Sequence, residues 1–168
     1  CCDILELDIN KFRDIDVIWA SPPCTTFSVA SISTHWTGGK GVYIPKTENA
    51  KTGIALVKKT VAIIEQLKPK YFFIENPRGV LRKLDLIPYE RKTLCYCRYG
   101  DTRMKPTDIW TNLSNWNPKM CHNNNPDHER APRGAKTGTQ GLKGAKERGV
   151  IPELLFYEIF GIMNEVDK

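Results

Sequence analysis

The chain has 168 residues, of which 40% are hydrophobic and 26% charged, and its formal net charge is +6. This length predicts one compact domain over residues 1–168. No apolar run approaches the roughly 20 residues that a membrane helix needs, and the N-terminus lacks a signal-peptide layout, so we expect a soluble, cytoplasmic protein that contacts no membrane. Six cysteines, two of them adjacent, do not resemble a secreted disulfide framework, which predicts reduced thiols.

The positive charge is concentrated in one region of the chain. Residues 91–150 carry 12 Lys and Arg against 5 Asp and Glu. Clustered basic side chains suit a polyanion such as nucleic acid, because they displace its counterions. A solvated basic face that keeps the protein soluble explains the charge equally well.

The first half of the chain predicts a strand, a helix and a second strand. Asp16–Ala20 and Tyr71–Glu75 are apolar runs of the kind found in buried strands. Between them, residues 54–67 repeat apolar side chains at helical spacing, and Pro69 ends the pattern. This order implies parallel strands joined by a right-handed crossover in an open α/β sheet.

The second half predicts a hairpin, a long irregular region and a final helix. Residues 92–99 and 106–112 are two further strands, joined by a turn at Gly100 and Asp101. Residues 113–150 are rich in Asn, Gly, Pro and basic residues without sustained periodicity, so we expect a loop region there. Residues 151–166 predict a C-terminal helix with Pro152 in its first turn.

Chemically useful side chains follow both predicted parallel strands. Cys24 comes four residues after the first strand, while Glu75 and Asn76 end the second. Because ligands bind outside the carboxyl ends of strands in such sheets, these side chains can share one cleft. Taken singly, a lone cysteine is more often a packing residue and a strand-terminal glutamate a surface charge.

Four segments together resemble the DNA cytosine-5 methyltransferases, in particular small phage-encoded members. "SPPCTTFS" resembles their Pro-Pro-Cys motif and "FIENPRG" their Glu-Asn motif. "YGDTRMKPTDIWTN" is similar to a later motif with two basic residues, and "APRGAKTGTQGLKGAKERGVIP" to the family's terminal segment. The order of the segments matches throughout the chain. The resemblance implies that the protein acts in the cytoplasm of a prokaryotic or phage-infected host cell.

The resemblance implies a Rossmann-like, S-adenosylmethionine-dependent methyltransferase fold, with a mostly parallel sheet and a C-terminal hairpin. It implies transfer of a methyl group from S-adenosylmethionine to carbon 5 of a flipped cytosine in DNA. The thiolate of Cys24 adds to carbon 6 of the base, while Glu75 holds or protonates ring nitrogen 3. The catalytic set that it implies is Cys24, Glu75, Asn76, Arg103 and Lys105.

The resemblance also assigns DNA contacts and a moving segment. The stretch from Val29 to Gly53 resembles the family's mobile catalytic loop, although an ordinary surface loop is the alternative. Residues 113–133 occupy the place of a target-recognition domain, but they are too few for an independent core. We expect DNA contacts from Ser28, Arg133, Lys136, Lys143 and Lys146.

The family's cofactor site is only partly represented in these residues. Asp3 resembles an acid that contacts the adenine, and Pro22 lies at the strand end beside it. No glycine-rich turn precedes Cys24, so the sequence resembles an N-terminally truncated member. We therefore expect weak binding of S-adenosylmethionine, and an N-terminal segment or partner polypeptide that completes the site.

Two further questions stay open at this level. Zinc ligation by Cys95, Cys97, Cys121, His122 and His128 lacks the usual paired spacing, so we predict no metal. The alternatives to DNA methylation are a catalytically silent DNA-binding relative and an RNA cytosine-5 methyltransferase. Calorimetry with S-adenosylmethionine distinguishes an active enzyme from a silent relative. Competition between DNA and RNA substrates distinguishes a DNA methyltransferase from an RNA methyltransferase.

Overall fold

The computed structural model describes residues 2–39, 41–122, 124–130, 132, 134 and 144–166. It divides the chain into two compact units. The first unit holds Cys1–Arg91 and Asp108–Asn112, and the second holds Lys92–Thr107 and Leu113–Lys168. The single domain that the sequence predicts stays a prediction, and each unit is described by itself.

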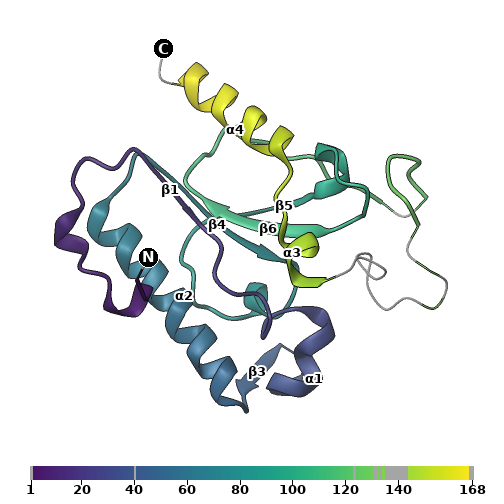
Figure 1. The fold of residues 1–168 in the computed structure, drawn as a ribbon, viewed down its shortest axis with the longest axis horizontal. Helices are drawn as coiled ribbons and strands as arrows, with labels where there is room; N and C mark the ends of the chain where they lie inside the picture. Colours follow the sequence, from purple (N-terminus) through teal and green to yellow (C-terminus); the bar gives the residue numbers. More distant parts are fainter. Residues whose placement is uncertain are drawn as a thin grey trace. The chain divides into compact units, whose positions relative to one another are not determined.

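The first unit contains the predicted strand, helix and strand (Figure 1). Strands β1 (Val17–Ala20) and β4 (Tyr71–Pro77) pair in parallel, with Val17 opposite Tyr71 and Ala20 opposite Ile74. Helix α2 (Glu48–Leu67) connects them. The crossover predicted from the sequence is therefore confirmed. Two 3₁₀ turns, η1 (Ile4–Glu6) and η2 (Ile9–Lys11), precede β1 and contact α2.

Helix α2 begins and ends where local chemistry requires it. The Thr47 hydroxyl accepts a hydrogen bond from the Ala50 N–H at 3.2 Å, which caps the first turn. At the other end Lys68 adopts a left-handed conformation, φ 47°, and Pro69 cannot continue the helix. Its buried face packs on β4 in a core that includes Val57, Val61, Ile64, Phe72 and Ile74.

The four-stranded sheet is mixed and has the order β1-β4-β6-β5. Strands β5 (Arg91–Cys95) and β6 (Pro106–Thr111) form the predicted hairpin, since the Tyr96 N–H bonds the Lys105 carbonyl and the Thr111 N–H bonds the Glu90 carbonyl. The Asn112 side chain, directly after β6, bonds the backbone of Lys70 and Phe72 at the start of β4. Strands β4 and β6 therefore run in opposite directions.

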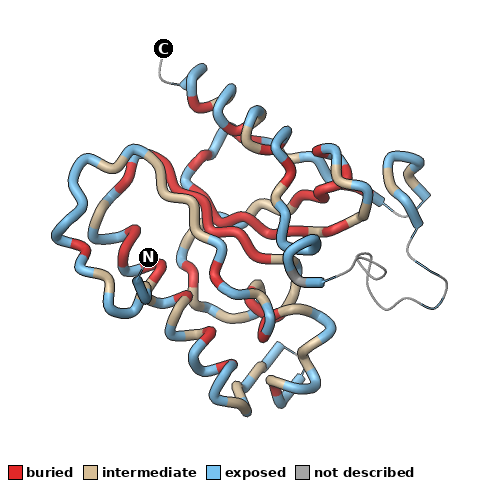
Figure 2. Tube along the Cα trace, viewed as in Figure 1, coloured by how far each residue is buried: buried red, intermediate tan, exposed pale blue. Residues whose placement is uncertain are grey.

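The mostly parallel sheet that we expected is not what the described residues show. Among them, β1 and β4 are the parallel pair, and the strands on the other side of β4 run against their neighbours. Strand β4 is nevertheless buried along nearly its whole length, as Figure 2 shows. A continuous apolar run indicates burial on both faces, and such burial does not require parallel neighbours.

Residues 29–53 are more regular than the predicted mobile loop. They contain η3 (Val29–Ser31), α1 (Ile32–His35) and an antiparallel pair, β2 (Trp36–Gly39) with β3 (Val42–Pro45). Helix α2 already begins at Glu48. Gly38 and Gly41 both have positive φ, as glycines in hairpin turns often do. Glycines of this kind are equally common in loops, so the sequence alone does not distinguish the hairpin from a loop.

The second unit is built around the turn η5 (Tyr96–Tyr99) and the helix α4 (Glu153–Val166), which contact each other. The predicted strand 92–99 is thus a shorter strand followed by a 3₁₀ turn. Helix α4 confirms the predicted C-terminal helix, and a short helix, α3 (Gly144–Gly149), lies within the region predicted as loop.

A half-buried carboxylate anchors α4 in the second unit. The Glu158 carboxylate accepts hydrogen bonds from the Tyr99 hydroxyl at 2.8 Å and the Trp116 indole at 2.9 Å, and it pairs with Lys119 at 2.6 Å. Burial alone opposes the charge of Glu158, but these donors outweigh it and lower its pKa.

The turn η4 (Leu81–Lys83) completes the elements of the first unit.

Within the described part of the chain, no helix is both long enough and apolar enough to span a bilayer.

Candidate active site

Cys24 lies in a tight turn directly after β1. Its carbonyl accepts hydrogen bonds from the N–H groups of Phe27 and Ser28, both at 3.0 Å. The side chain of Cys24 is half-buried, whereas Thr26 and Phe27 behind it are buried. The two prolines before Cys24 restrict φ, so the chain leaves the strand in a fixed direction. The thiol is therefore accessible on a turn whose base is packed.

The second motif contacts the first through Asn76. Its side-chain amide donates a hydrogen bond to the Pro22 carbonyl at 2.9 Å, and the Asn76 side chain is completely buried. Pro22 is two residues before Cys24. The parallel pairing of β1 and β4 places the two motifs at the same strand ends, as predicted. Asn76 thus fixes the backbone of the cysteine turn.

Two glycines allow the chain to approach this turn closely. A Cβ atom at Gly79 would lie 2.1 Å from the Phe27 carbonyl oxygen, and one at Gly53 would lie 2.8 Å from the Thr26 hydroxyl. Gly79 pairs with Ser28 in an antiparallel bridge, and the Val80 N–H bonds the Phe27 carbonyl at 2.7 Å. No side chain larger than hydrogen fits at Gly79 without moving the turn.

Trp36 supports the turn from the β2–β3 hairpin. Its indole N–H donates to the Thr26 carbonyl at 2.6 Å, and the ring packs on Phe27 with centroids 5.8 Å apart. Sequence reasoning missed Trp36, Gly53 and Gly79, because their role is set by contacts across 10 to 50 residues. The Glu-Asn motif's own final glycine, Gly79, was the one available signal.

Glu75 provides a carboxyl group at this strand end. It is 6% exposed and lies in β4, one residue before Asn76. Because β1 and β4 pair in parallel, Cys24, Glu75 and Asn76 belong to one framework in the first unit.

The predicted basic pair lies in the second unit and just before β6 rather than within it. The Arg103 guanidinium pairs with Glu129 at 3.0 Å and donates to the Arg130 carbonyl at 2.8 Å. Lys105 donates to the Arg148 carbonyl at 2.8 Å, with its ammonium 4.5 Å from the centroid of the Tyr96 ring. Both side chains are held by their own unit.

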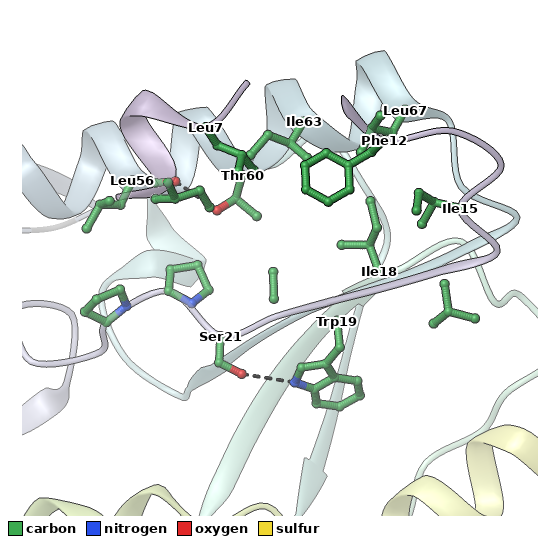
Figure 3. A pocket seen from close by; sticks show the side chains of 15 residues that line it. Leu7, Phe12, Ile15, Ile18, Trp19, Ser21, Leu56, Thr60, Ile63 and Leu67 are labelled. Atoms are coloured by element: carbon green, nitrogen blue, oxygen red, sulfur yellow. Dashed lines mark hydrogen bonds between the residues drawn. The ribbon is translucent and has the colours of Figure 1, made fainter. Parts of the chain in front are cut away.

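A largely apolar groove of about 520 Å³ runs beside β1 and under α2 in the first unit (Figure 3). Phe12, Ile18 and Ile63 point into it. Pro22 lines the groove and is buried. Asp3 is exposed and accepts a hydrogen bond from the Leu5 N–H at 2.9 Å, so it caps η1. Of the two predicted cofactor residues, Pro22 alone is among those that line the groove.

The structure describes only two of the five residues predicted to contact DNA. Arg133, Lys136 and Lys143 lie outside the described residues. Lys146 is exposed on α3, and Ser28 is half-buried with its hydroxyl 3.0 Å from that of Ser31.

Several basic side chains of residues 91–150 bind acidic groups of the same unit. Besides Arg103, Arg98 pairs with Asp127 and Lys119 with Glu158. These internal pairs remove part of the positive charge that the composition assigns to a nucleic-acid surface.

A half-buried cysteine on a turn, with a carboxyl group and an amide at the neighbouring strand end, is an arrangement that suits an enzyme with a nucleophilic cysteine. The model of the C-5 cytosine-specific DNA methylases matches residues 1–87. A probable DNA (cytosine-5)-methyltransferase of Frog virus 3 (isolate Goorha) is 32% identical over 160 residues, which cover 87% of this chain and 75% of the relative.

The chain belongs to the C-5 cytosine-specific DNA methylase family. The resemblance drawn from the four motifs is confirmed, and the enzyme class is a DNA cytosine-5 methyltransferase.

Proposed function

We propose that this chain methylates carbon 5 of cytosine in DNA through a covalent bond between the Cys24 sulfur and carbon 6 of the base. The hydrogen bond from Asn76 to the Pro22 carbonyl carries the proposal, because it joins the cysteine motif to the acid motif at one sheet edge. This arrangement supports a Rossmann-like methyltransferase fold, as does the antiparallel hairpin after the parallel pair.

Cys24 supplies the nucleophile. Cytosine is poorly nucleophilic at carbon 5, and a thiolate that bonds to carbon 6 pushes an electron pair toward that carbon. Cys24 is half-buried, and its carbonyl accepts hydrogen bonds from the N–H groups of Phe27 and Ser28, so the backbone that carries the sulfur is fixed. A base must leave the duplex to reach such a turn.

Glu75 supplies the proton or hydrogen bond that the addition requires. A carboxyl group can donate a hydrogen bond or a proton to ring nitrogen 3, which avoids an unsupported anion on the ring. Asn76 acts as a positioning residue, since its amide binds Pro22 rather than a substrate atom. After methylation, a base takes the carbon 5 proton, ring nitrogen 3 returns its proton to Glu75, and the Cys24 sulfur leaves as a thiolate.

S-adenosylmethionine, when bound, supplies an electrophilic methyl group. The residues present fit only its adenine end: the groove walls are apolar, and the hydroxyls of Ser21 and Thr60 in its lining already bond Trp19 and the Leu56 carbonyl. Pro22 and, through the backbone of η1, Asp3 are the residues that would hold that end. We therefore expect calorimetry to show weak binding of S-adenosylmethionine to the 168 residues.

Hydrogen exchange at carbon 5 tests the Cys24 chemistry without the methyl donor. Thiolate addition makes carbon 5 basic, so a solvent proton adds there, and elimination then releases either hydrogen. DNA with tritium at cytosine carbon 5 should lose tritium to water in the presence of the chain, and Cys24→Ser should abolish the loss. No release would favour the silent DNA-binding relative, and faster release from labelled RNA would favour an RNA substrate.

A further inference from the structure

The second unit gathers soft metal ligands that lie far apart in sequence. Cys97 belongs to η5, whereas Cys121 and His128 belong to the irregular segment beyond Trp116. One ligand atom of each lies within 4.8 Å of the others. The sequence spacing argued against a metal, but the fold brings three of the five candidate ligands together.

These side chains contact one another inside the unit. The Cys121 sulfur lies 3.4 Å from Nδ1 of His128, and Cys97 and Cys121 are both buried. Cys95 is completely buried in the same cluster, with its sulfur 4.0 Å from the Cys121 carbonyl oxygen. The three cysteines thus share one buried cluster, and the half-buried His128 contacts it through the Cys121 sulfur.

Contacts on both sides of His128 hold it in this place. Asp127 pairs with Arg98, the Glu129 N–H donates to the Thr102 carbonyl at 2.8 Å, and the Glu129 carboxylate pairs with Arg103 at 3.0 Å. The segment that carries His128 is therefore fastened to the η5 turn and the residues after it. A ligand set positioned by its own backbone loses little entropy when a metal binds.

We propose that Cys97, Cys121 and His128 bind a structural Zn²⁺ ion, with Cys95 as the fourth ligand. Tetrahedral zinc at ordinary bond lengths separates two thiolates by ~3.8 Å, so the three atoms within 4.8 Å need to contract by at most roughly 1 Å. Thiolate and imidazole ligands select zinc over hard cations, and structural sites take four protein ligands. Binding releases the three thiol protons to solvent.

The ion would connect Cys121 and His128 to η5, which carries Cys97. Glu129 and Arg130, the partners of Arg103, follow directly. The metal would therefore position Arg103 through its partners, and it takes no part in methyl transfer. The inference does not depend on the proposed function.

Metal content of the unmodified 168-residue chain is the first measurement. After reconstitution with zinc under reducing conditions and removal of excess metal, elemental analysis should find one zinc per chain. Cobalt substitution should give the visible bands of a tetrahedral ion and ultraviolet thiolate charge-transfer bands, and a chelator should lower the melting temperature. These three measurements use the unmodified chain, so they do not depend on whether a variant folds.

Variants then identify the ligands. Cys97→Ser, Cys121→Ser and His128→Ala should each lower zinc affinity by more than ~100-fold, beyond what loss of an outer-shell partner costs. His128→Cys should retain the metal, and Cys2→Ser, at an exposed thiol of the other unit, should bind zinc normally. Cys95→Ser should lower the affinity and the charge-transfer intensity.

Three results would overturn the proposal. They are a reconstituted chain without stoichiometric zinc, a disulfide between Cys97 and Cys121 that persists under the reducing conditions, and unchanged zinc affinity in Cys121→Ser. Unchanged affinity and spectra in Cys95→Ser would remove Cys95 from the ligand set.

Discussion

Asn76 and Pro22 are 54 residues apart in sequence and are joined by a hydrogen bond of 2.9 Å. The bond connects the end of β4 to the backbone two residues before Cys24. Because the Asn76 side chain is buried, water cannot replace it as the donor. The backbone that carries the Cys24 thiol is therefore held by the Asn76 side chain.

Asn76→Ala should weaken both the fold and the activity. It leaves the Pro22 carbonyl without its donor, which should lower the free energy of unfolding by about 1–3 kcal/mol. Urea unfolding measures this loss. The rate of tritium release from labelled DNA, which should fall, measures the effect of displacing the Cys24 thiol. Asn10→Ala, at an exposed position of η2, should change stability by less than ~0.5 kcal/mol. Equal effects of the two changes would contradict the positioning role.

Gly79→Ala should displace the cysteine turn by direct overlap. The added methyl group would lie 2.1 Å from the Phe27 carbonyl oxygen, which is backbone and cannot swing away. We expect a loss of roughly 1–3 kcal/mol in unfolding free energy together with slower tritium release. Gly39→Ala is the control, since no heavy atom lies within 4 Å of its Cβ position. Normal stability of Gly79→Ala would mean that the turn is adaptable.

Glu75→Gln should separate catalysis from binding. Glutamine keeps the size of the side chain but cannot give up a proton, so turnover should fall by about 10²- to 10⁴-fold. DNA affinity, measured by fluorescence anisotropy, should change little. Glu65→Gln, at an exposed position of α2, is the matched control. Near-normal turnover would leave Glu75 a structural role only.

The Glu158 site predicts a pH-dependent part of the stability. Because the folded-state pKa of Glu158 is lowered, its contribution is present above the ordinary carboxyl pKa of 4.5 and is lost as pH falls through the folded value. Glu158→Gln should cost about 1–3 kcal/mol at pH 7, and the difference from the natural protein should shrink toward pH 3. Urea unfolding at several pH values measures it, with Glu165→Gln as an exposed control.

The salt dependence of DNA binding tests the basic region. Each phosphate contact contributes roughly 0.9 to the slope of log affinity against log salt, so changing Lys143 and Lys146 to glutamine should flatten the slope by up to about 2. Lys51→Gln, which removes a charge paired with Glu48 on α2, should leave the slope unchanged. An unaltered slope in the double variant would assign both lysines to a solvated face.

The sequence predicts those features that are local in the chain. Apolar runs located β1 and β4, helical spacing located α2 and α4, and the strand ends placed Cys24 and Asn76 together. The Trp36 contact with Thr26 and the gathering of Cys97 with His128 depend on long-range packing, which no spacing rule encodes. Charge counting likewise cannot tell that Arg98 and Arg103 already have acidic partners.

The backbone pairing between the cysteine turn and the chain after β4 has a consequence for local opening. The Phe27 carbonyl accepts from Val80, and the Cys24 carbonyl accepts from Phe27 and Ser28. The N–H groups of these three residues should therefore exchange with deuterium as slowly as those of the neighbouring sheet, since the turn cannot open without breaking a bond to β4's continuation. A reactive cysteine on a fast-exchanging loop would sample many orientations. We therefore expect the Cys24 turn to unfold together with the core rather than by itself.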